Sequence, residues 1–279
     1  VYVDATLGGG GHTREILSHL GPKGRLMVFD RDSDALANAP KDKRIIVVHN
    51  NFRYIHHFVR YYGFEGVDGI LTDLGVSSHQ FDTSERGFSF RFDAPLDMRM
   101  NTQAKKDART IINEYEEEEI ARLLKLYGEV DNSRKVASLI CSARSHSPIT
   151  TTGELTEAIK KVLPPVAEHK FLAKIYQALR IEVNGEMESL QYFLKGAERS
   201  LKPGGRLSVI TYHSLEDRMV KNFIKTGSID GKEDKDLYGR RLTTIKSVNK
   251  KPILPSDMEI ARNTRARSAK LRIGEKIDG

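Results

Sequence analysis

The first 13 residues constrain the fold of this chain more than any other segment. Residues 1–3 are β-prone, Asp4 stands where such a strand would end, and residues 8–11 are four consecutive glycines. A glycine inside a helix or strand costs roughly 0.5–1 kcal/mol relative to alanine, so the run predicts a turn. From Thr13 onward the apolar residues have helical spacing. This strand, glycine turn and helix predict a ligand at the carboxyl end of the strand.

Two common phosphate-binding motifs do not fit the glycine turn. In a G-x-G-x-x-G fingerprint that starts at Gly8 or Gly9, the third glycine position holds Thr13 or Arg14. A P-loop needs a lysine before its Ser or Thr, and His12 occupies that place here. The turn therefore favours a ligand that the backbone can approach closely and that needs no pyrophosphate site.

An acidic residue follows the glycine turn at the spacing expected for a nucleoside site. Residues 24–30 predict a second strand ending in Asp30, 19 residues after Gly11, and such an acid suits ribose hydroxyls. The alternative is that Asp30 caps a helix beginning near Ser33. A nucleoside bound without phosphates suggests S-adenosylmethionine as the ligand.

Further strand patterns complete an α/β fold. Apolar, β-prone runs separated by helical stretches predict a parallel, helix-covered sheet. We expect its other strands at residues 44–49, 67–74, 206–212, 242–245 and 268–273. Phe52, after the third strand, is expected either to pack on an adenine face or to belong to the core. Asp73 stands at the end of the fourth strand.

A helical insertion is expected to interrupt the sheet domain. Residues 75–101 lack regular periodicity but are rich in Phe and Met, so we expect an ordered loop beside the site. Between residues 105 and 170 the apolar spacing is helical and no strand pattern occurs. We therefore predict an α/β domain at residues 1–104 and 171–279 and a helical, substrate-recognition insertion at residues 105–170.

Several other chemistries lack their motifs. Ser214 with Asp217 fits a helix capping box, which we favour over a catalytic Ser/His pair because no G-x-S-x-G elbow occurs. The nine histidines form no H-E-x-x-H pattern, and one cysteine cannot form a cluster. No metal site is therefore expected. The single cysteine, Cys141, fits a reducing cytoplasm. No apolar run approaches the ~20 residues of a membrane helix. Because Val1 already lies in the first strand, we expect the natural N-terminus upstream.

Positive charge is concentrated near the C-terminus. The net charge is +7, and residues 218–279 contain 16 Lys and Arg against 8 Asp and Glu. A basic segment on a near-neutral body indicates a polyanionic partner such as nucleic acid. A solvated, lysine-rich surface is an equally open alternative.

Seven motifs occur together in order across the chain. They are D-A-T-L-G-G-G-G-H-T at 4–13, D-R-D at 30–32, D-L-G-V-S-S at 73–78, E-R-G-F-S-F at 85–90, P-L-D-M-R-M at 95–100, H-S-L-E-D-R at 213–218 and R-A-R-S at 265–268. In this combination the sequence closely resembles the bacterial 16S ribosomal RNA cytosine-N4 methyltransferase family (RsmH, also called MraW). The resemblance implies a Rossmann-like methyltransferase domain with a helical insertion and S-adenosylmethionine as donor. It also implies a decoding-centre cytidine of small-subunit rRNA as acceptor.

The resemblance also implies site residues, placed by their positions in these motifs. Cofactor contacts are expected at Gly10, Gly11, His12, Asp30, Phe52, Asp73 and Gln80. Ser77 and Ser78 are expected to orient the base. Arg265 and Arg267 are expected to bind RNA, with internal contacts near a closing strand as the alternative.

The expected chemistry needs an acceptor at the end of the fourth strand. An exocyclic amine is a poor nucleophile because its lone pair is delocalised into the ring, so the protein must position it and accept its hydrogen bond. Asp73 is the expected catalytic acceptor, and a backbone carbonyl in residues 74–76 is the alternative. A third possibility is that Asp73 only caps backbone amides. The base must be single-stranded or flipped out of a duplex.

Two other functions remain open from the sequence. One is an NAD-dependent oxidoreductase on the same sheet, which the absent third glycine disfavours. The other is a non-catalytic ribosome-assembly factor that retains the methyltransferase fold, which the presence of Asp30 and Asp73 disfavours. The sequence leaves the oligomeric state and the recognised stage of subunit assembly open.

Overall fold

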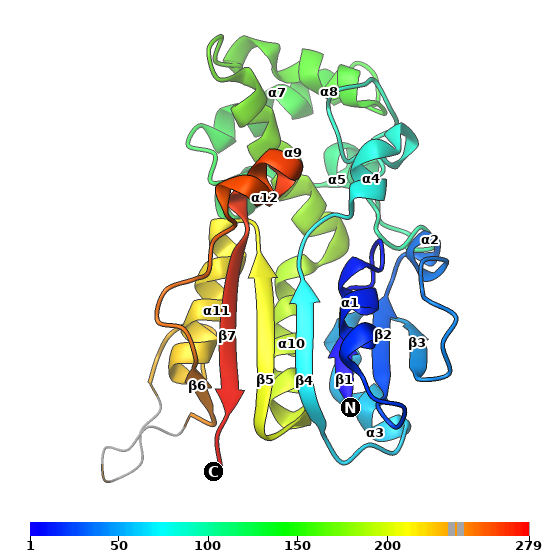
Figure 1. The fold of residues 1–279 in the computed structure, drawn as a ribbon. Helices are drawn as coiled ribbons and strands as arrows, with labels where there is room; N and C mark the ends of the chain where they lie inside the picture. The colour runs from blue at the N-terminus through cyan, green and yellow to red at the C-terminus, as the bar shows by residue number, and fades with distance from the viewer. Residues whose placement is uncertain (234–237, 239–242, 279) are drawn as a thin grey trace. The chain divides into compact units, whose positions relative to one another are not determined.

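A seven-stranded sheet forms the first of the two units into which the chain divides, residues 1–75 and 187–279. The computed structural model describes residues 1–233, 238 and 243–278. Its strands are β1 (Tyr2–Asp4), β2 (Leu26–Asp30), β3 (Ile45–His49), β4 (Val67–Asp73), β5 (Leu201–Thr211), β6 (Ile245–Ser247) and β7 (Lys270–Lys276). Their order across the sheet is β3-β2-β1-β4-β5-β7-β6 (Figure 1). The predicted Rossmann-like sheet is thereby confirmed.

The parallel arrangement holds for five of the seven strands. β1 to β5 pair in parallel, whereas β7 lies antiparallel between β5 and β6. β6 and β7 lie close to the strands predicted at residues 242–245 and 268–273. Leu242, the first residue of the predicted range 242–245, lies outside the described residues. β5 begins earlier than predicted because residues 201–205 already belong to it.

Apolar residues on both faces of the strands bury the sheet between two helical layers. Met27 and Phe29 of β2 belong to one core cluster, and Leu26 and Val28 belong to another. The first face is covered by α3 (Ile55–Tyr61), α10 (Glu186–Ser200) and α11 (Ser214–Thr226), and the second by α1 (Gly11–His19) and α2 (Ser33–Leu36). Short elements complete the unit: η1 (Phe52–Tyr54), α12 (Asp257–Arg262) and η4 (Thr264–Ser268). Burial on both faces is what a parallel sheet requires.

The second unit, residues 76–186, is helical. It contains α4 (Ser78–Asp82), η2 (Ser84–Arg86), α5 (Ala108–Glu114), α6 (Glu117–Gly128), α7 (Ser133–Arg144), α8 (Thr152–Ile159), η3 (Lys160–Val162) and α9 (Glu168–Asn184). The unit is wider than the predicted insertion at 105–170. Leu172, Ile175 and Leu179 of α9 pack in the same core as the other helices, so α9 belongs with them. α9 ends at Asn184 and is capped by Gly185, whose φ of 56° is left-handed.

The apolar loop expected to be ordered also belongs to the helical unit. Phe88, Leu96, Met98 and Met100 are buried in its core cluster, which explains why the loop residues pack with the helices. Asn184 fastens the loop, because its Oδ1 accepts from Met100 N at 2.8 Å and its Nδ2 donates to Met98 O at 2.8 Å. The division of the chain therefore falls at residue 75 rather than at residue 104.

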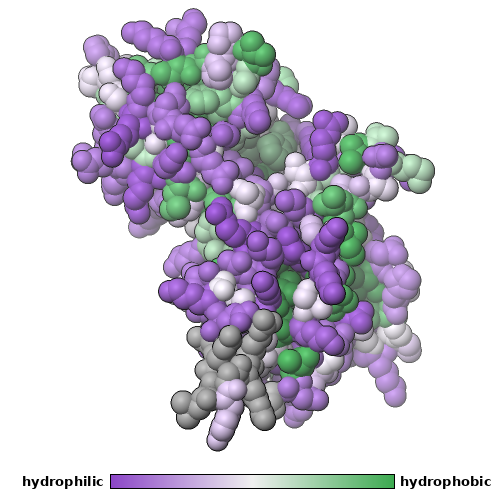
Figure 2. Space-filling view, turned by 90° about the vertical axis from the view of Figure 1, so that its left-hand side faces the viewer, coloured by the Kyte–Doolittle hydropathy of each residue, from purple (hydrophilic) through white to green (hydrophobic). Residues whose placement is uncertain are grey.

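The surface drawn in Figure 2 is mainly hydrophilic, with small separate hydrophobic areas. This agrees with a composition in which 30% of the residues are charged. No helix in the described ranges has both the length and the apolar character needed to span a membrane.

Candidate active site

Three acidic residues stand at the carboxyl ends of neighbouring strands. β1 lies between β2 and β4, and these strands end in Asp4, Asp30 and Asp73 (Figure 1). The strand order reverses here, since β2 and β3 lie on one side of β1 and β4 and β5 on the other. In open α/β sheets ligands bind outside the carboxyl ends of strands at such a switch point. The predicted ligand edge therefore carries a group of carboxylates.

The glycine turn after β1 combines a fixed part with an open part. Gly10 has a φ of 73°, and a Cβ on it would lie 2.8 Å from the carbonyl oxygen of Asn38. A Cβ on Gly9 or Gly11 would meet no atom within 4 Å. Gly10 is thus required by the backbone, whereas the open space at Gly9 and Gly11 allows a ligand to approach the main chain.

Asp30 holds the turn against β2. Its Oδ2 accepts a hydrogen bond from Gly8 N at 2.9 Å and its Oδ1 accepts from Asp32 N at 2.9 Å. Burial raises the pKa of this carboxyl above its usual value, against the lowering effect of the two amides. The alternative of Asp30 as the helix cap is wrong, because Asp32 is the N-cap of α2 and accepts from Asp34 N.

Asp73 is held from two sides by side chains. The hydroxyl of Tyr212 donates to its Oδ1 at 2.9 Å, and Nε2 of His12 lies 3.6 Å from its Oδ2. Its backbone N–H donates to Oγ1 of Thr6 at 2.7 Å, which ties β4 to the segment after β1. The side chain remains 30% exposed, so a ligand can still reach the carboxylate.

The electrostatics around His12 favour its protonated form. The Asp73 carboxylate, and with a smaller effect Asp4, raises the pKa of His12 above 6.5, although partial burial opposes this. Asp4 is fully buried, and burial raises the pKa of its carboxyl to about 6 despite a 2.6 Å hydrogen bond from Thr13. The surroundings thus raise the pKa of both groups, that of His12 through the Asp73 carboxylate and that of Asp4 through burial.

Sequence reasoning did not identify Tyr212, the first residue after β5. Burial raises the pKa of its phenol well above the usual value, and the neighbouring Asp73 carboxylate adds to the rise. The phenol is therefore a hydrogen-bond donor at physiological pH. The sequence offered only weak evidence for Tyr212, because it precedes the H-S-L-E-D-R motif at 213–218 and belongs to no motif itself.

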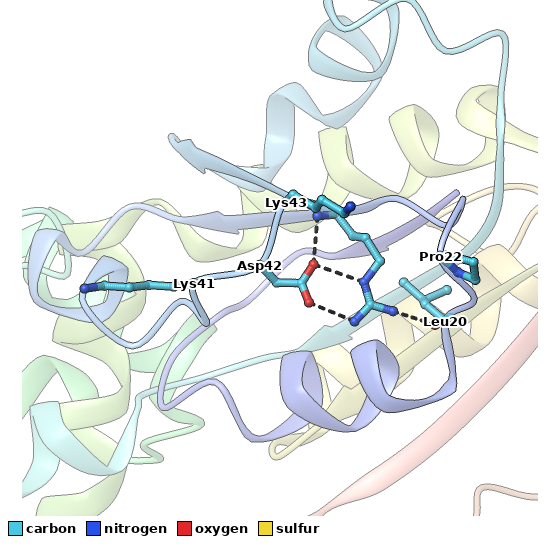
Figure 3. A pocket seen from close by; sticks show the side chains of 6 residues that line it. Leu20, Pro22, Lys41, Asp42 and Lys43 are labelled. Carbon is cyan, nitrogen blue, oxygen red and sulfur yellow. Dashed lines mark hydrogen bonds and ion pairs between the residues drawn. The ribbon is translucent and has the colours of Figure 1, made fainter.

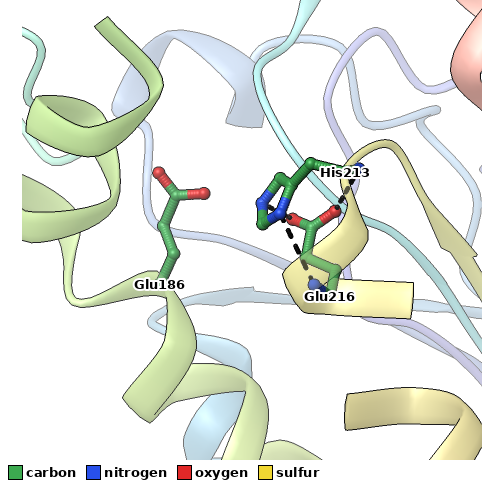
Figure 4. A group of neighbouring side chains, drawn as sticks. All are labelled: Glu186, His213 and Glu216. Carbon is green, nitrogen blue, oxygen red and sulfur yellow. Dashed lines mark hydrogen bonds and ion pairs between the residues drawn. The ribbon is translucent and has the colours of Figure 1, made fainter. Parts of the chain in front are cut away.

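The capping box predicted at Ser214 and Asp217 is displaced by one residue. α11 begins at Ser214, so the N-cap is His213, and its box partner is Glu216, whose Oε2 also accepts from Tyr212 N at 3.0 Å (Figure 4). Asp217 instead pairs with Arg272 of β7 at 2.7 Å. The N-cap is thus a histidine, a residue type that the capping pattern does not favour.

The other predicted cofactor contacts have structural partners as well. Phe52 is half-buried and packs edge-to-face on Phe193 of α10, with 5.0 Å between ring centroids. In the helical unit, Gln80 is only 4% exposed and forms a capping box with Ser77, the N-cap of α4. Ser78 is the first residue of that helix.

The two arginines predicted to bind RNA lie on η4. Arg265 and Arg267 are exposed, whereas Ala266 between them is buried. Asn263 caps the turn by accepting from Arg265 N at 3.2 Å. The local fold therefore displays both side chains on the surface.

A shallow pocket lies at the opposite edge of the sheet. It is lined by Leu20, Pro22, Lys41, Asp42, Lys43 and Arg44, before the first residue of β3 (Figure 3). The Arg44 guanidinium donates to both oxygens of Asp42 and to Leu20 O, so this cation is already paired. The pocket is distinct from the carboxylate edge and carries none of the predicted site residues.

The sequence of the whole chain matches known proteins. A model of the MraW methylase family matches residues 1–277. A Bacteroides fragilis protein named ribosomal RNA small subunit methyltransferase H is 58% identical over 275 residues, which cover 99% of this chain and 90% of that protein. A Flavobacterium johnsoniae protein of the same name is 55% identical over 277 residues, with 99% and 91% covered.

Proposed function

Because the chain belongs to the MraW methylase family, we propose that it methylates the exocyclic N4 of a decoding-centre cytidine in the 16S rRNA of the small ribosomal subunit. The proposed donor is S-adenosylmethionine, and the proposed setting is the bacterial cytoplasm. The observation that carries the proposal is the Asp73 carboxylate, held by Tyr212 and His12 beside the open glycine turn.

The carboxylate edge fits an adenosine-containing donor. A Cβ at Gly11 would meet no atom within 4 Å, and Gly10 before it packs against the carbonyl oxygen of Asn38. A carboxylate offers about four acceptor positions, so Asp30 can receive ribose hydroxyls in addition to its two amides. When bound, S-adenosylmethionine supplies an activated methyl group on a sulfonium. We propose that Phe52 borders the adenine and that Gln80 is a further contact.

Asp73 is proposed to act on the amine of the target base. By accepting a hydrogen bond from N4, its carboxylate returns electron density to nitrogen and fixes its direction of attack. Tyr212 donates to one carboxylate oxygen and thereby fixes the orientation of the group. Nε2 of His12 lies 3.6 Å from the other oxygen and flanks the carboxylate on that side. N4 loses a proton on methylation, and we propose that the Asp73 carboxylate accepts it.

Other residues are proposed to hold the RNA. We propose that Ser77 and Ser78 orient the base and that exposed Arg265 and Arg267 contact phosphates. The helical unit, residues 76–186, is the proposed substrate-recognition part. Since N4 pairs in a duplex, the base must be presented single-stranded or flipped out.

The test is methyl transfer from labelled S-adenosylmethionine to unmodified small subunits, followed by nucleoside mapping. We expect the label in N4-methylcytidine at a single position. Label in another nucleoside would correct the target atom. If RNA binds without any transfer, the chain is the non-catalytic assembly factor that the sequence left open.

A further inference from the structure

Two neighbouring helices of the sheet unit share an outer surface rich in aromatic and basic side chains. α3 and α10 pack closely at Gly196, where a Cβ would lie 3.0 Å from Ile55 Cγ2. We call this surface the aromatic–basic face, and it consists of Arg53, Tyr54, His57, Arg60, Tyr61, Tyr192, Lys195 and Arg199. Arg53 is half-buried and the other seven residues are exposed.

Contacts between these side chains make part of the face preformed. The guanidinium of Arg53 lies 4.5 Å from the ring centroid of Tyr192 and 5.5 Å from that of Tyr54. Its Nη1 also pairs with Glu188 at 3.2 Å. The Tyr54 ring in turn contacts His57, with 6.2 Å between centroids. The two tyrosines are therefore held by a cation instead of by burial.

The exposure of the rings has no explanation in the packing of the unit. Tyr61 is 78% exposed, Tyr192 48% and Tyr54 43%. Single exposed aromatics are ordinary, but here Tyr54 and Tyr192 share one guanidinium, that of Arg53, and Tyr61 follows Tyr54 and His57 at helical spacing. The face contains four Arg or Lys residues, and Glu188 is the carboxylate paired within it. The pKa of the adjoining His56 is lowered by burial and further by Arg199, His57 and Arg60.

We propose that the aromatic–basic face binds unpaired nucleotides of the substrate RNA away from the reacting base. Tyrosine rings and arginine planes stack on bases, and exposed cations contact phosphates. Protein-binding surfaces are also enriched in tyrosine and arginine but are depleted of lysine, and this face carries Lys195 beside its three arginines. The face extends from Arg53, which pairs with Glu188 in the first turn of α10, to the end of that helix, where His56 lies 3.2 Å from Ser200 beside the amino end of β5. The identity of the RNA rests on the proposed function, whereas RNA binding by this face does not.

The experiment compares two double variants with a matched control. Tyr61→Ala with Tyr192→Ala removes exposed rings, and Arg60→Glu with Lys195→Glu reverses exposed charges. Lys41→Glu with Lys43→Glu is the control, because it makes the same change in net charge at exposed positions outside both this face and the basic segment 218–279. Affinity for unmodified, in vitro transcribed small-subunit rRNA is measured against salt concentration. Methyl transfer to small subunits is measured separately at saturating concentrations.

We expect the tyrosine variant to lose about fivefold to a hundredfold in RNA affinity, the range for a lost stacked base. The charge variant should lower the log–log salt slope by roughly 1.4–1.8 more than the control does, for two lost phosphate contacts. Transfer at saturation should stay unchanged in both. Affinity and slope equal to those of the control would overturn the proposal.

Two further outcomes separate this proposal from the proposed function. Loss of binding to whole small subunits, with naked rRNA binding unchanged, would identify a protein partner and overturn RNA recognition by this face. Weakened RNA binding by the variants, together with no methyl transfer by the unaltered protein, would support the face while the proposed function fails.

Discussion

The hydroxyl of Tyr212 donates a 2.9 Å hydrogen bond to Oδ1 of Asp73, although 139 positions separate the two residues in the chain. Asp73 ends β4 and Tyr212 directly follows the neighbouring β5, and Leu74 N, next to Asp73, donates to Ile210 O at 3.0 Å. With His12 on its other side, the Asp73 carboxylate has a fixed direction at the open edge of the sheet. Residues in the first turn of α1 and directly after β5 thus hold the carboxylate at the end of β4.

Removal of the Tyr212 hydroxyl should slow the reaction without weakening RNA binding. In Tyr212→Phe the carboxylate loses the donor that orients it, and we expect kcat to fall about tenfold, the scale of one hydrogen bond to a charged group. Tyr2→Phe is the matched control, since Tyr2 lies at the amino end of β1. A kcat equal to that of the control would remove Tyr212 from the mechanism.

Asp30→Ala should weaken S-adenosylmethionine binding by about 1.5–3 kcal/mol, or roughly tenfold to a hundredfold. The loss reflects missing hydrogen bonds to ribose hydroxyls, and calorimetric titration measures it. Asp32→Ala is the control for the local fold, because it removes the cap of α2 two residues away. An unchanged Kd in Asp30→Ala, or the same loss in both variants, would contradict ribose binding by Asp30.

Two adjacent glycines should separate stability from ligand binding. Gly10→Ala forces a left-handed φ of 73° on a residue with a Cβ and creates a 2.8 Å contact, so the free energy of unfolding should fall by about 1–2 kcal/mol or more. Gly11→Ala meets no atom, so stability should change by less than about 0.5 kcal/mol while donor affinity falls. Urea unfolding and calorimetry distinguish the two. Full donor affinity in Gly11→Ala would place the donor elsewhere.

The imidazole of His12 should titrate above pH 6.5 because of Asp73. Protonated His12 then contributes to folding stability below pH 6.5, and this contribution is lost as pH rises through the folded-state pKa. An NMR titration of the ring proton in the unaltered protein and in Asp73→Asn measures the effect. We expect a lower pKa in the variant. Equal pKa values in the two proteins would mean that Asp73 does not act on His12.

The sequence predicted the edge of the sheet that carries the site but not all contacts on it. Asp30 and Asp73 were predictable because each ends an apolar run, and strand ends follow from local pattern. Tyr212 was not, because its partner is set by the order of strands in the sheet. The cap of α11 was misplaced by one residue for a local reason, since His213 takes a role usually filled by Ser or Asp.

The boundary of the helical unit depended on packing that periodicity does not reveal. Residues 76–104 contain few regular elements, yet Leu96 and Met98 are fully buried among the helices that follow. Gly87 shows the same close packing, because a Cβ there would lie 2.2 Å from Pro95 O. Membership of a core is a tertiary property, whereas the predicted boundary rested on where helical spacing begins.

The rate of methyl transfer by Asp73→Asn under single-turnover conditions tests the central claim most directly. The substitution keeps the shape of the side chain but turns part of the acceptor into a donor, so the rate at saturating donor and RNA should fall about a hundredfold or more. RNA affinity should change little, because phosphate contacts supply most of it. Transfer at the unaltered rate would contradict the account and assign the acceptor role to a backbone carbonyl in residues 74–76.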